Sequence, residues 1–575
     1  MNIDPIEEIP NNNSEYDMDI DNGGENHKSH FVNLLVDKNK YTIPTTFKQL
    51  LNSNEKEKWL NACHSELQSI KDNKVYQLVH KRTIKRGTPI IRGRWVFTVK
   101  KETDNSERFK ARLVAKGFTQ KRGENYIDTY APVTTYDTLR LIFAISSINK
   151  WDITQLDAKN AFLNGKIDYP IYFDAPEGTK TPKDHVWLLK KGLYGLKQAP
   201  RIWYYTLTET LKQNGFKSSE LEPCLLYKKD CLVLIYVDDI LIASANPKIT
   251  KGVIKCLNRK FIMKNMGSPK VFLGISIKKN KKQEYKISME DTIEKLENDY
   301  KIVPTLRKLI TPIAKGFETD NKAPFLKEKD YSQYRSIIGS LIFIANTVRL
   351  DISFAVSYLS RYLQAPRTCH LKSAFRMVHY LIQTKSYGIK FSSNNMPVPY
   401  KDFRYLDKTG DVSIIDYPNY GKYKLATITD ADFAADKEDR TSQSGHITLL
   451  NNNIISWSSK KQKCVALSTA ESEYISLSEG IKSSTYFRNL LKEMKSSTTV
   501  VDLIGDNKAS LTLSSHNTQH QKTKHIDVRY HHLRDLVSKK IIKINYVNTK
   551  DNISDMLTKL LDTTTHQNLI KHIPI

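Results

Sequence analysis

The sequence predicts an α+β architecture followed by a compact α/β domain, and three observations lead to this prediction. A basic stretch over 92–117 contains two β-prone runs on either side of the turn-forming residues DNSE. The apolar run LVLIYVDDILIAS, 232–244, is typical of a hairpin of two strands. From 423 onward, strand-like and helix-like segments follow one another in a compact order.

The composition is strongly basic and indicates a polyanionic partner. Among 575 residues, 89 are Lys or Arg and 62 are Asp or Glu, which gives a net charge of +27. Nucleic acid is the natural partner for such a charge. The alternative is a chain that is merely rich in lysine because AT-rich DNA encodes it. The length allows roughly three or four domains.

Six cysteines are scattered along the chain and form neither a C-x-x-C motif nor a cluster with histidine. This pattern favours a reducing compartment and argues against a zinc finger or a disulfide scaffold. The first residues are acidic and polar, unlike a signal peptide. No uncharged apolar run reaches the ~20 residues that a membrane span needs, so we expect no membrane partner.

The N-terminal half begins with a polar tail, 1–40, that we expect to be disordered because it has few aromatic residues. Apolar periodicity and turn residues predict the elements that follow. They are a helix over 47–73 with Trp59, Leu60, Cys63, Leu67 and Ile70 on one face, the hairpin over 92–117, a helix over 137–150, a strand beginning at 151, a helix over 199–215 that ends at Gly215, and the hairpin over 232–244.

The C-terminal half divides into a helical block, a linker and an α/β domain. The block over 331–384 is helix-rich, and the polar stretch over 393–422 is predicted to be a loop or linker. The domain that follows is predicted to contain a strand, a hairpin with an Asn turn, the long helix STAESEYISLSEGIKSSTYFRNLLKEM, a strand running into a helix, and a last strand followed by a final helix.

Three aspartates lie where predicted strands end or bend. Asp157 closes the strand ITQLDAKNAF, and Asp238 and Asp239 lie at the bend of the apolar hairpin. If these strands are neighbours in one sheet, the three carboxylates converge and repel one another. Two Mg²⁺ ions would relieve the repulsion, because they prefer oxygen ligands, and would stabilise the oxygens of a phosphoryl transfer. For the adjacent aspartates alone, the alternative is an ordinary turn.

Several long motifs carry a family resemblance. YVDDILIAS resembles the catalytic motif of reverse transcriptases, and ITQLDAKNAFLNG, FKARLVAKGFTQ, YIDTYAPVTTYDTLRLIFAIS and LLKKGLYGLKQAPRIWY resemble the Pol region of copia-like LTR retrotransposons. The resemblance implies an α+β right-hand polymerase followed by an α/β RNase H-like domain. The implied parts are a tail over 1–40, fingers and palm over 41–290, a helical thumb and connection over 291–395, a linker over 396–422 and the RNase H-like domain over 423–575.

The resemblance also assigns roles in the polymerase half. It makes Asp157, Asp238 and Asp239 the catalytic metal ligands. Phe162 would exclude a ribose 2′-hydroxyl and so select deoxynucleotides, with plain core packing as the alternative. Arg112 would contact the incoming triphosphate, with Lys100 as a second candidate; both could instead belong to a solvated basic face. Gln198 of LKQAP would sit against the nucleotide and template.

In the C-terminal domain, four carboxylates follow the order of a retrotransposon RNase H. They are Asp430, Glu473, Asp506 and Asp555, of which the first three would also bind metal, and a two-metal site would activate water against RNA in a hybrid. Two neighbours compete, because Asp432 shares a strand face with Asp430 and Glu471 flanks the same helical stripe as Glu473. Asp555 has the alternative of a favourable acid in the first turn of a helix.

Other features qualify the resemblance. The strip QKTKHIDVRYHHLRD, 521–535, is predicted to touch the backbone of a hybrid rather than to bind metal. Residues 541–555 lack the histidine that many RNases H carry before their last aspartate. ANTVRLDISFA and TKLL depart from the family's usual TRP and TKPL. Because no protease or nucleocapsid motif is present, we expect a truncated element or the C-terminal part of a polyprotein.

The sequence therefore predicts an RNA-directed DNA polymerase with RNase H activity that uses two Mg²⁺ or Mn²⁺ ions per active site. The implied partners are an RNA template, a DNA primer and product, an RNA–DNA hybrid and deoxynucleoside triphosphates, together with a second copy of the chain or the element's integrase. The implied location is the cytoplasm, within a virus-like particle, or the nucleus. The alternative is an inactive relic that only binds nucleic acid.

Overall fold

A computed structural model describes residues 41–101, 106–303, 307–393, 401–402, 422–496, 500–515 and 532–574. The predicted tail over 1–40, nearly all of the predicted linker and most of the strip over 521–535 lie outside these residues. The chain forms two compact units. The first unit is Met1–Ala131 with Asn160–Thr206, and the second unit is Pro132–Lys159 with Leu207–Ile575.

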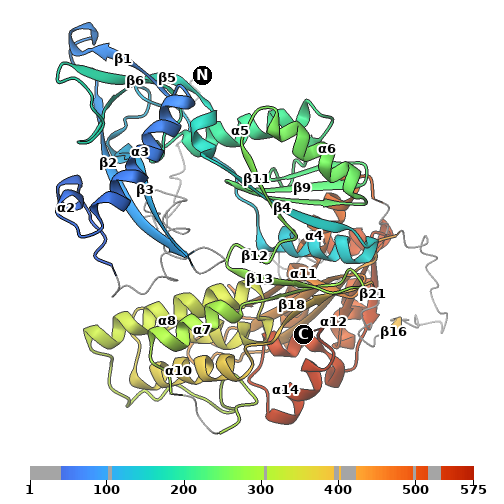
Figure 1. Ribbon diagram of the computed structural model, residues 1–575. Coiled ribbons are helices and arrows are strands. Elements are labelled where there is room, and N and C mark those ends of the chain that lie inside the picture. Colours follow the sequence, from blue (N-terminus) through green and yellow to red (C-terminus); the bar gives the residue numbers. More distant parts are fainter. Residues whose placement is uncertain are drawn as a thin grey trace, which may run out of the picture. The chain divides into compact units, whose positions relative to one another are not determined.

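The first unit is built on a five-stranded sheet in the order β1-β6-β5-β2-β3 (Figure 1). The predicted hairpin over 92–117 is confirmed, because β2 pairs antiparallel with β3 along its length. The strands are β1 (Tyr76–His80), β2 (Ile90–Lys101), β3 (Glu107–Ala115), β5 (Lys166–Asp174) and β6 (His185–Lys191), with 3₁₀ turns η1 (Lys81–Thr83), η2 (Gly117–Thr119) and η3 (Ala161–Asn164) between them.

The single helix predicted over 47–73 is wrong, because the structure has two helices there. They are α2 (Phe47–Leu51) and α3 (Lys56–Asp72). The break falls at Asn-Ser-Asn over 52–54, residues whose side chains compete for backbone hydrogen bonds and disfavour a helix interior. The ring of Trp59, fully buried on α3, packs 4.6 Å from the ring of Phe109 on β3.

The second unit begins with a six-stranded sheet in the order β11-β4-β10-β9-β8-β7. The predicted hairpin over 232–244 is confirmed as β9 (Cys231–Tyr236) and β10 (Asp239–Ser244). The remaining strands are β4 (Asp152–Ala158), β7 (Lys217–Ser218), β8 (Leu225–Lys228) and β11 (Met263–Gly267), and the helices are α4 (Tyr136–Asn149), α6 (Pro247–Asn258) and α5 (Ala199–Lys212), which begins in the first unit.

The predicted helical block over 331–384 is confirmed and lies beside a small antiparallel sheet. Its helices are α8 (Glu328–Thr347), η4 (Leu350–Ile352), α9 (Ser353–Ser360) and α10 (Thr368–Gln383), preceded by α7 (Glu290–Asp299), and α10 packs against both α7 and α8 (Figure 1). The sheet contains β12 (Val271–Phe272), β13 (Ile275–Lys279), β14 (Tyr285–Ser288) and β15 (Gly388–Phe391). None of the described helices is long and apolar enough to cross a membrane.

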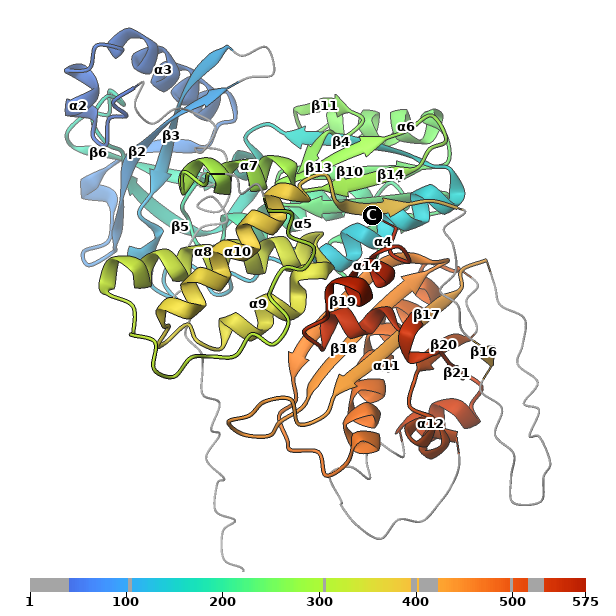
Figure 2. The same cartoon turned by 90° about the horizontal axis from the view of Figure 1, so that it is seen from below.

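The last part of the chain is a six-stranded mixed sheet in the order β16-β21-β20-β17-β18-β19. β17, β20 and β21 run parallel, and the long helix α11 packs on β17 and β18 (Figure 2). The predicted Asn turn is confirmed, with Asn451 and Asn452 at φ 45° and 63°. The elements are β16 (Lys401–Asp402), β17 (Leu425–Asp432), β18 (Gln443–Leu450), β19 (Asn453–Lys461), α11 (Thr469–Glu493), β20 (Val501–Gly505), α12 (Lys508–Ser515) and β21 (Ile542–Tyr546).

The final helix predicted directly after β21 is wrong in its position. Two 3₁₀ turns follow the strand, η5 (Thr549–Asp551) and η6 (Ile553–Leu557), and the α-helix α14 (Thr563–Ile570) comes later. Asn548 and Asn552 cap the two turns through their side chains, which interrupts the helix. Asp555 therefore lies in a buried 3₁₀ turn and not in the first turn of an α-helix.

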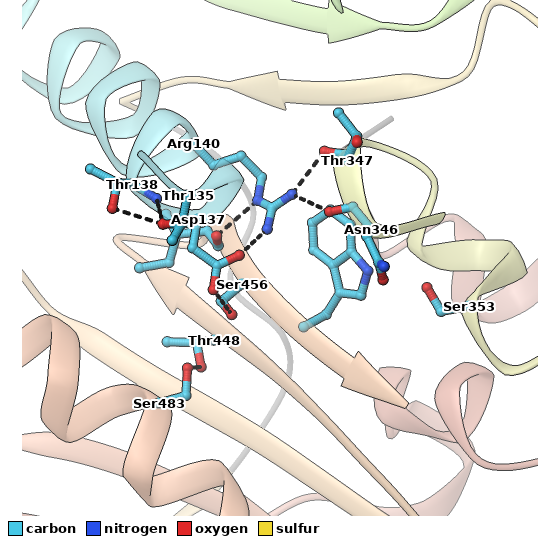
Figure 3. A network of polar contacts seen from close by, with 12 residues as sticks. Thr135, Asp137, Thr138, Arg140, Asn346, Thr347, Ser353, Thr448, Ser456 and Ser483 are labelled. Atoms are coloured by element: carbon cyan, nitrogen blue, oxygen red, sulfur yellow. Dashed lines mark hydrogen bonds and ion pairs between the residues drawn. The ribbon is translucent and has the colours of Figure 1, made fainter. Parts of the chain in front are cut away.

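A buried arginine joins three parts of the second unit (Figure 3). Arg140 on α4 is 2% exposed and donates to the carbonyl oxygens of Ile455 on β19 (2.9 Å) and Thr347 at the end of α8 (2.8 Å). Its guanidinium lies 3.9 Å from the centroid of the Trp457 ring and forms an ion pair with Asp137. The C-terminal sheet is thus docked against α4 by specific polar contacts within a buried interface.

Candidate active sites

The three aspartates of the polymerase half meet at one end of the central sheet. β4 and β10 are antiparallel neighbours, and Asp157 lies directly opposite Asp239 in their register. Asp238 lies in the turn before β10, and its carbonyl oxygen accepts a hydrogen bond from the Ala158 N–H at 2.8 Å. All three side chains are half-buried. We call Asp157, Asp238 and Asp239 the hairpin site.

The turn that carries Asp238 is strained at Val237. β9 and β10 are joined by the two residues Val237 and Asp238, and Val237 has φ 53°, in the left-handed region. A β-branched residue seldom adopts this conformation, and such strain costs on the order of 1–3 kcal/mol. The buried strands on both sides hold the turn in place. The sequence did not reveal this feature, because valine has no turn preference.

Two of the residues predicted to bind a nucleotide lie around one tyrosine in the first unit. Arg112 on β3 places its guanidinium 5.2 Å from the centroid of the Tyr194 ring. Phe162 in η3 is 7% exposed and meets the same ring edge to face at 5.1 Å. Tyr194, which the sequence analysis missed, connects the two. The side chain of Lys100 lies outside the described part of the chain.

Gln198 lies in a buried hydrogen-bond network of its own partners. Its amide nitrogen donates to the Asn125 carbonyl oxygen at 2.9 Å, and its amide oxygen accepts from Gln120 at 2.9 Å. Gln120 in turn accepts from the Lys197 N–H at 2.7 Å. These contacts hold the segment after β3, so Gln198 has a positioning role, and its contact with a nucleotide stays a prediction.

Three carboxylates of the C-terminal domain converge within metal-ligand range. The oxygens of Asp430 on β17, Glu473 on α11 and Asp506 after β20 lie within 4.8 Å of one another. Asp430 is fully buried and Glu473 is 5% exposed. We call these residues the cluster site. Among the described residues, the carboxylate oxygens of the hairpin site do not form such a group within 4.8 Å.

The geometry distinguishes the cluster residues from their sequence neighbours. Asp432 is not a member of the group, and burial raises the pKa of its carboxyl to about 6. Glu471 lies in the first turn of α11, where its side chain accepts a hydrogen bond from the Leu467 N–H at 2.8 Å and its own N–H donates to the N-cap residue Ser468. Asp430 and Glu473 are therefore the better placed candidates.

Burial and mutual repulsion dominate the electrostatics of the cluster site. Burial raises the pKa of Glu473 well above its usual value, and the carboxylates of Asp430 and Asp506 raise it further. Burial and Asp430 likewise raise the pKa of Asp506. A divalent cation fits this donor set, since hard oxygen ligands that repel one another are what Mg²⁺ and Mn²⁺ bind.

Asp555 reaches the cluster site through a lysine that the sequence analysis missed. Lys559 places its Nζ 2.9 Å from Asp555 Oδ1 and 3.1 Å from Asp430 Oδ1. Thr558 donates to the other oxygen of Asp430. The only sequence signal for these contacts was the motif TKLL, which we noted as a departure from the family.

Comparisons with known proteins place the chain in a family. Residues 73–315 match the family described as "Reverse transcriptase (RNA-dependent DNA polymerase)". The chain is 31% identical over 532 residues to the Retrovirus-related Pol polyprotein from transposon TNT 1-94 of Nicotiana tabacum, covering 90% of this chain and 38% of that protein. It therefore spans about a third of the length of the curated Pol polyproteins it matches.

Two further comparisons concern a shorter relative and a solved structure. A transposon Ty5-1 protein of Saccharomyces cerevisiae is 35% identical, over 57% of this chain and 99% of that protein. The foamy viral protease-reverse transcriptase in complex with dsDNA resembles the chain with a TM-score of 0.44 and 12% identity, over 86% of this chain and 83% of that chain. On the strength of the sequence matches, the chain belongs to the reverse transcriptase family of Ty1/copia-type retrotransposon Pol polyproteins.

Proposed function

We propose that the chain is an RNA-directed DNA polymerase that also has RNase H activity. The observation that supports the polymerase is the register of Asp157 opposite Asp239, with Asp238 in the adjoining turn, in a chain of the reverse transcriptase family. The proposed substrates are deoxynucleoside triphosphates, a DNA primer and an RNA template, whose phosphates match the net charge of +27.

The hairpin site would hold divalent ions through its carboxylate oxygens. Members of this family generally use divalent metal ions, and Mg²⁺ or Mn²⁺ suits such ligands. When bound, two ions stabilise the attacking 3′-oxygen and the leaving pyrophosphate. The strained turn at Val237 and the buried strands β9 and β10 fix where Asp238 and Asp239 lie. Preorganised ligands of this kind need little rearrangement during the reaction.

The residues around Tyr194 would recognise the nucleotide. Arg112 would bind the triphosphate through its planar guanidinium. Phe162 would close the space beside the ribose 2′-carbon, and its packing on Tyr194 at 5.1 Å fixes its ring. Tyr194 would thereby orient both residues for one substrate.

The cluster site supports the second activity, the cleavage of RNA in a hybrid. Asp430, Glu473 and Asp506 would hold the ions, and Asp555 would complete the set. When bound, the ions generate a hydroxide nucleophile and stabilise the leaving oxygen. The surrounding sheet and α11 bury the carboxylates, which strengthens their interaction with a cation.

The test measures both activities in one set of variants. Primer extension on poly(rA)/oligo(dT) and cleavage of a labelled RNA–DNA hybrid are measured with Mg²⁺ and with Mn²⁺. We expect Asp238→Asn to reduce extension by at least about a hundredfold, since even residues behind the metal ligands change activity 10–100-fold, and to leave hybrid cleavage intact. Salt-sensitive nucleic-acid binding by the wild type without any extension would overturn the proposal in favour of an inactive relic.

A matched control comes from the same hairpin. Asp230 precedes β9, is exposed, and has φ 58°, a conformation that asparagine also tolerates. Asp230→Asn makes the same chemical change at the opposite end of the strand. Normal extension by Asp230→Asn, beside its loss in Asp238→Asn, would assign the effect to the hairpin site.

A further inference from the structure

Lys559 lies beside the cluster site, between the carboxylates of Asp430 and Asp555. It follows η6, its side chain is 30% exposed, and its Nζ bridges Oδ1 of the fully buried Asp430 and Oδ1 of Asp555 at 3.1 and 2.9 Å. Asp555 is not among the three carboxylates that lie within 4.8 Å of one another. The lysine ammonium therefore links the carboxylate of Asp555 to that of Asp430.

The charge of Lys559 acts on the whole group. Burial raises the pKa of Glu473, Asp506 and Asp555, and the charge of Asp430 raises each further, whereas the ammonium of Lys559 opposes these shifts in all three. A single positive charge so placed partly offsets the repulsion among four carboxylates. In the protein without metal, Lys559 therefore reduces the repulsion among the carboxylates, as a bound divalent cation would do.

The two oxygens of Asp430 are held by different groups. Thr558 donates to Oδ2, and Lys559 contacts Oδ1. A metal ligand oxygen lies about 2.0–2.1 Å from Mg²⁺, which leaves no room for an ammonium on the same side. If the lysine leaves Oδ1, Thr558 still fixes the orientation of the Asp430 carboxylate.

The Lys559 side chain is also partly open to its surroundings, since it is 30% exposed. It lines a small cavity together with Asp351 and His566. Its four-carbon stem is flexible, and its ammonium is a compact charge that water solvates well. The exposed part of the side chain gives the ammonium a route to solvent, away from the carboxylates.

We propose that Lys559 is a displaceable internal cation, which holds Asp430 and Asp555 together in the metal-free protein and competes with a divalent ion for the same two oxygens. This inference rests on the proposed metal site of the RNase H activity. Lys559 is a positioning residue in this role, and it sets the metal concentration at which the cluster site fills.

The test measures Mn²⁺ binding by electron paramagnetic resonance, on the full chain carrying Asp238→Asn and Asp239→Asn to remove binding at the hairpin site. Lys559→Met should lower the Kd for Mn²⁺ by about tenfold, at the lower end of what residues around metal ligands achieve. Lys559→Arg keeps the charge and binds carboxylates with two donors, so it should raise the Kd. Hybrid cleavage should reach half its maximum at lower Mg²⁺ in Lys559→Met.

The matched control is Lys550→Met, because Lys550 is an exposed lysine in the adjacent turn η5. A Lys559→Met protein that binds Mn²⁺ no more tightly than the wild type, or more weakly, would overturn the inference and leave Lys559 as a structural ion pair. If Lys559→Met is too unstable to measure, the Kd of Lys559→Arg decides: an unchanged or lower value overturns the inference.

The same experiment separates this inference from the proposed function. Glu473→Gln should weaken Mn²⁺ binding in the same background. If the wild-type cluster binds Mn²⁺ and Glu473→Gln does not, the metal site stands whatever Lys559 does. If neither binds Mn²⁺ at millimolar concentration, the metal site itself fails, and the inference fails with it.

Discussion

The hairpin site and the cluster site both gather aspartates, but at different depths. The hairpin site presents half-buried carboxylates from two paired strands and a two-residue turn. The cluster site gathers its carboxylates from β17, α11 and the end of β20, with Asp430 fully buried. The first arrangement stores strain in the backbone at Val237, and the second stores electrostatic repulsion that a lysine partly offsets.

This difference shows that like charges can be held together in two ways. A register of paired strands places half-buried carboxylates opposite one another, so the pairing of β4 and β10 sets which of them meet. A buried cluster needs compensating charge, because removing carboxylates from water disfavours their ionised form. Four predictions test the comparison, from the largest expected effect to the smallest.

The first prediction separates the two activities by a substitution in the cluster site. Glu473→Gln should reduce hybrid cleavage by at least about a hundredfold through loss of a metal ligand, and should leave primer extension within about twofold of the wild type. Glu438→Gln, an exposed residue of the same domain, is the control and should change neither rate. A parallel loss of both activities in Glu473→Gln would show that the two sites do not act independently.

The second prediction tests whether the buried contacts of Arg140 stabilise the part of the second unit that carries both sites. Arg140→Met should destabilise the second unit by about 2–4 kcal/mol, mainly because it leaves the carbonyl oxygens of Ile455 and Thr347 without this donor. The lost ion pair adds less, because the Asp137 side chain is 38% exposed. Urea unfolding, followed by tryptophan fluorescence, measures the shift in midpoint. Arg259→Met, at the exposed residue that directly follows α6, is the matched control, and equal midpoints for the two variants would contradict the prediction.

The third prediction concerns pH and metal removal. Burial and the charge of Asp430 raise the pKa of folded Asp555 to about 8, above about 3.9 for an unfolded aspartate. Between these values the folded protein keeps a proton that the unfolded chain has lost, so stability in the presence of EDTA should fall as pH rises from about 4 to about 8. Asp555→Asn should flatten this slope in thermal melts, whereas Asp238→Asn should leave it unchanged.

Saturating Mg²⁺ provides the second arm of this measurement. A bound cation favours the ionised carboxylates, so it should remove most of the pH slope in the wild type. A slope that is identical with EDTA and with Mg²⁺ would show that the cluster site does not bind the ion over this range.

The fourth prediction concerns the strain at the hairpin site. Val237→Gly relieves the left-handed conformation but adds freedom to the unfolded chain, so stability should rise by no more than about 1 kcal/mol. The looser turn should also lower the rate of nucleotide addition by a few fold while hybrid cleavage stays constant. Val233→Gly in the extended middle of β9 is the contrast, since it relieves no strain and should only destabilise.

Much of the fold could be predicted from local patterns. The hairpin over 92–117, the hairpin around Asp238 and the Asn turn at 451–452 were predicted correctly, because alternation and turn chemistry act over a few residues. The helix over 47–73 was predicted too long, because apolar spacing continues across an Asn-Ser-Asn break. The position of the final helix was wrong for a similar reason, since two asparagine side chains cap short turns before it.

The sequence by itself determined which acidic residues lie at strand ends, because strand ends are a local property. It also determined that these residues follow the order found in the family, because the matching motifs are long. Only the tertiary structure decided that Asp430 and Glu473, rather than Asp432 and Glu471, meet Asp506 within 4.8 Å. It alone brought Arg140 to a carbonyl oxygen 315 residues away along the chain. Such contacts depend on how whole elements pack, and neither the spacing nor the chemistry of neighbouring residues encodes them locally.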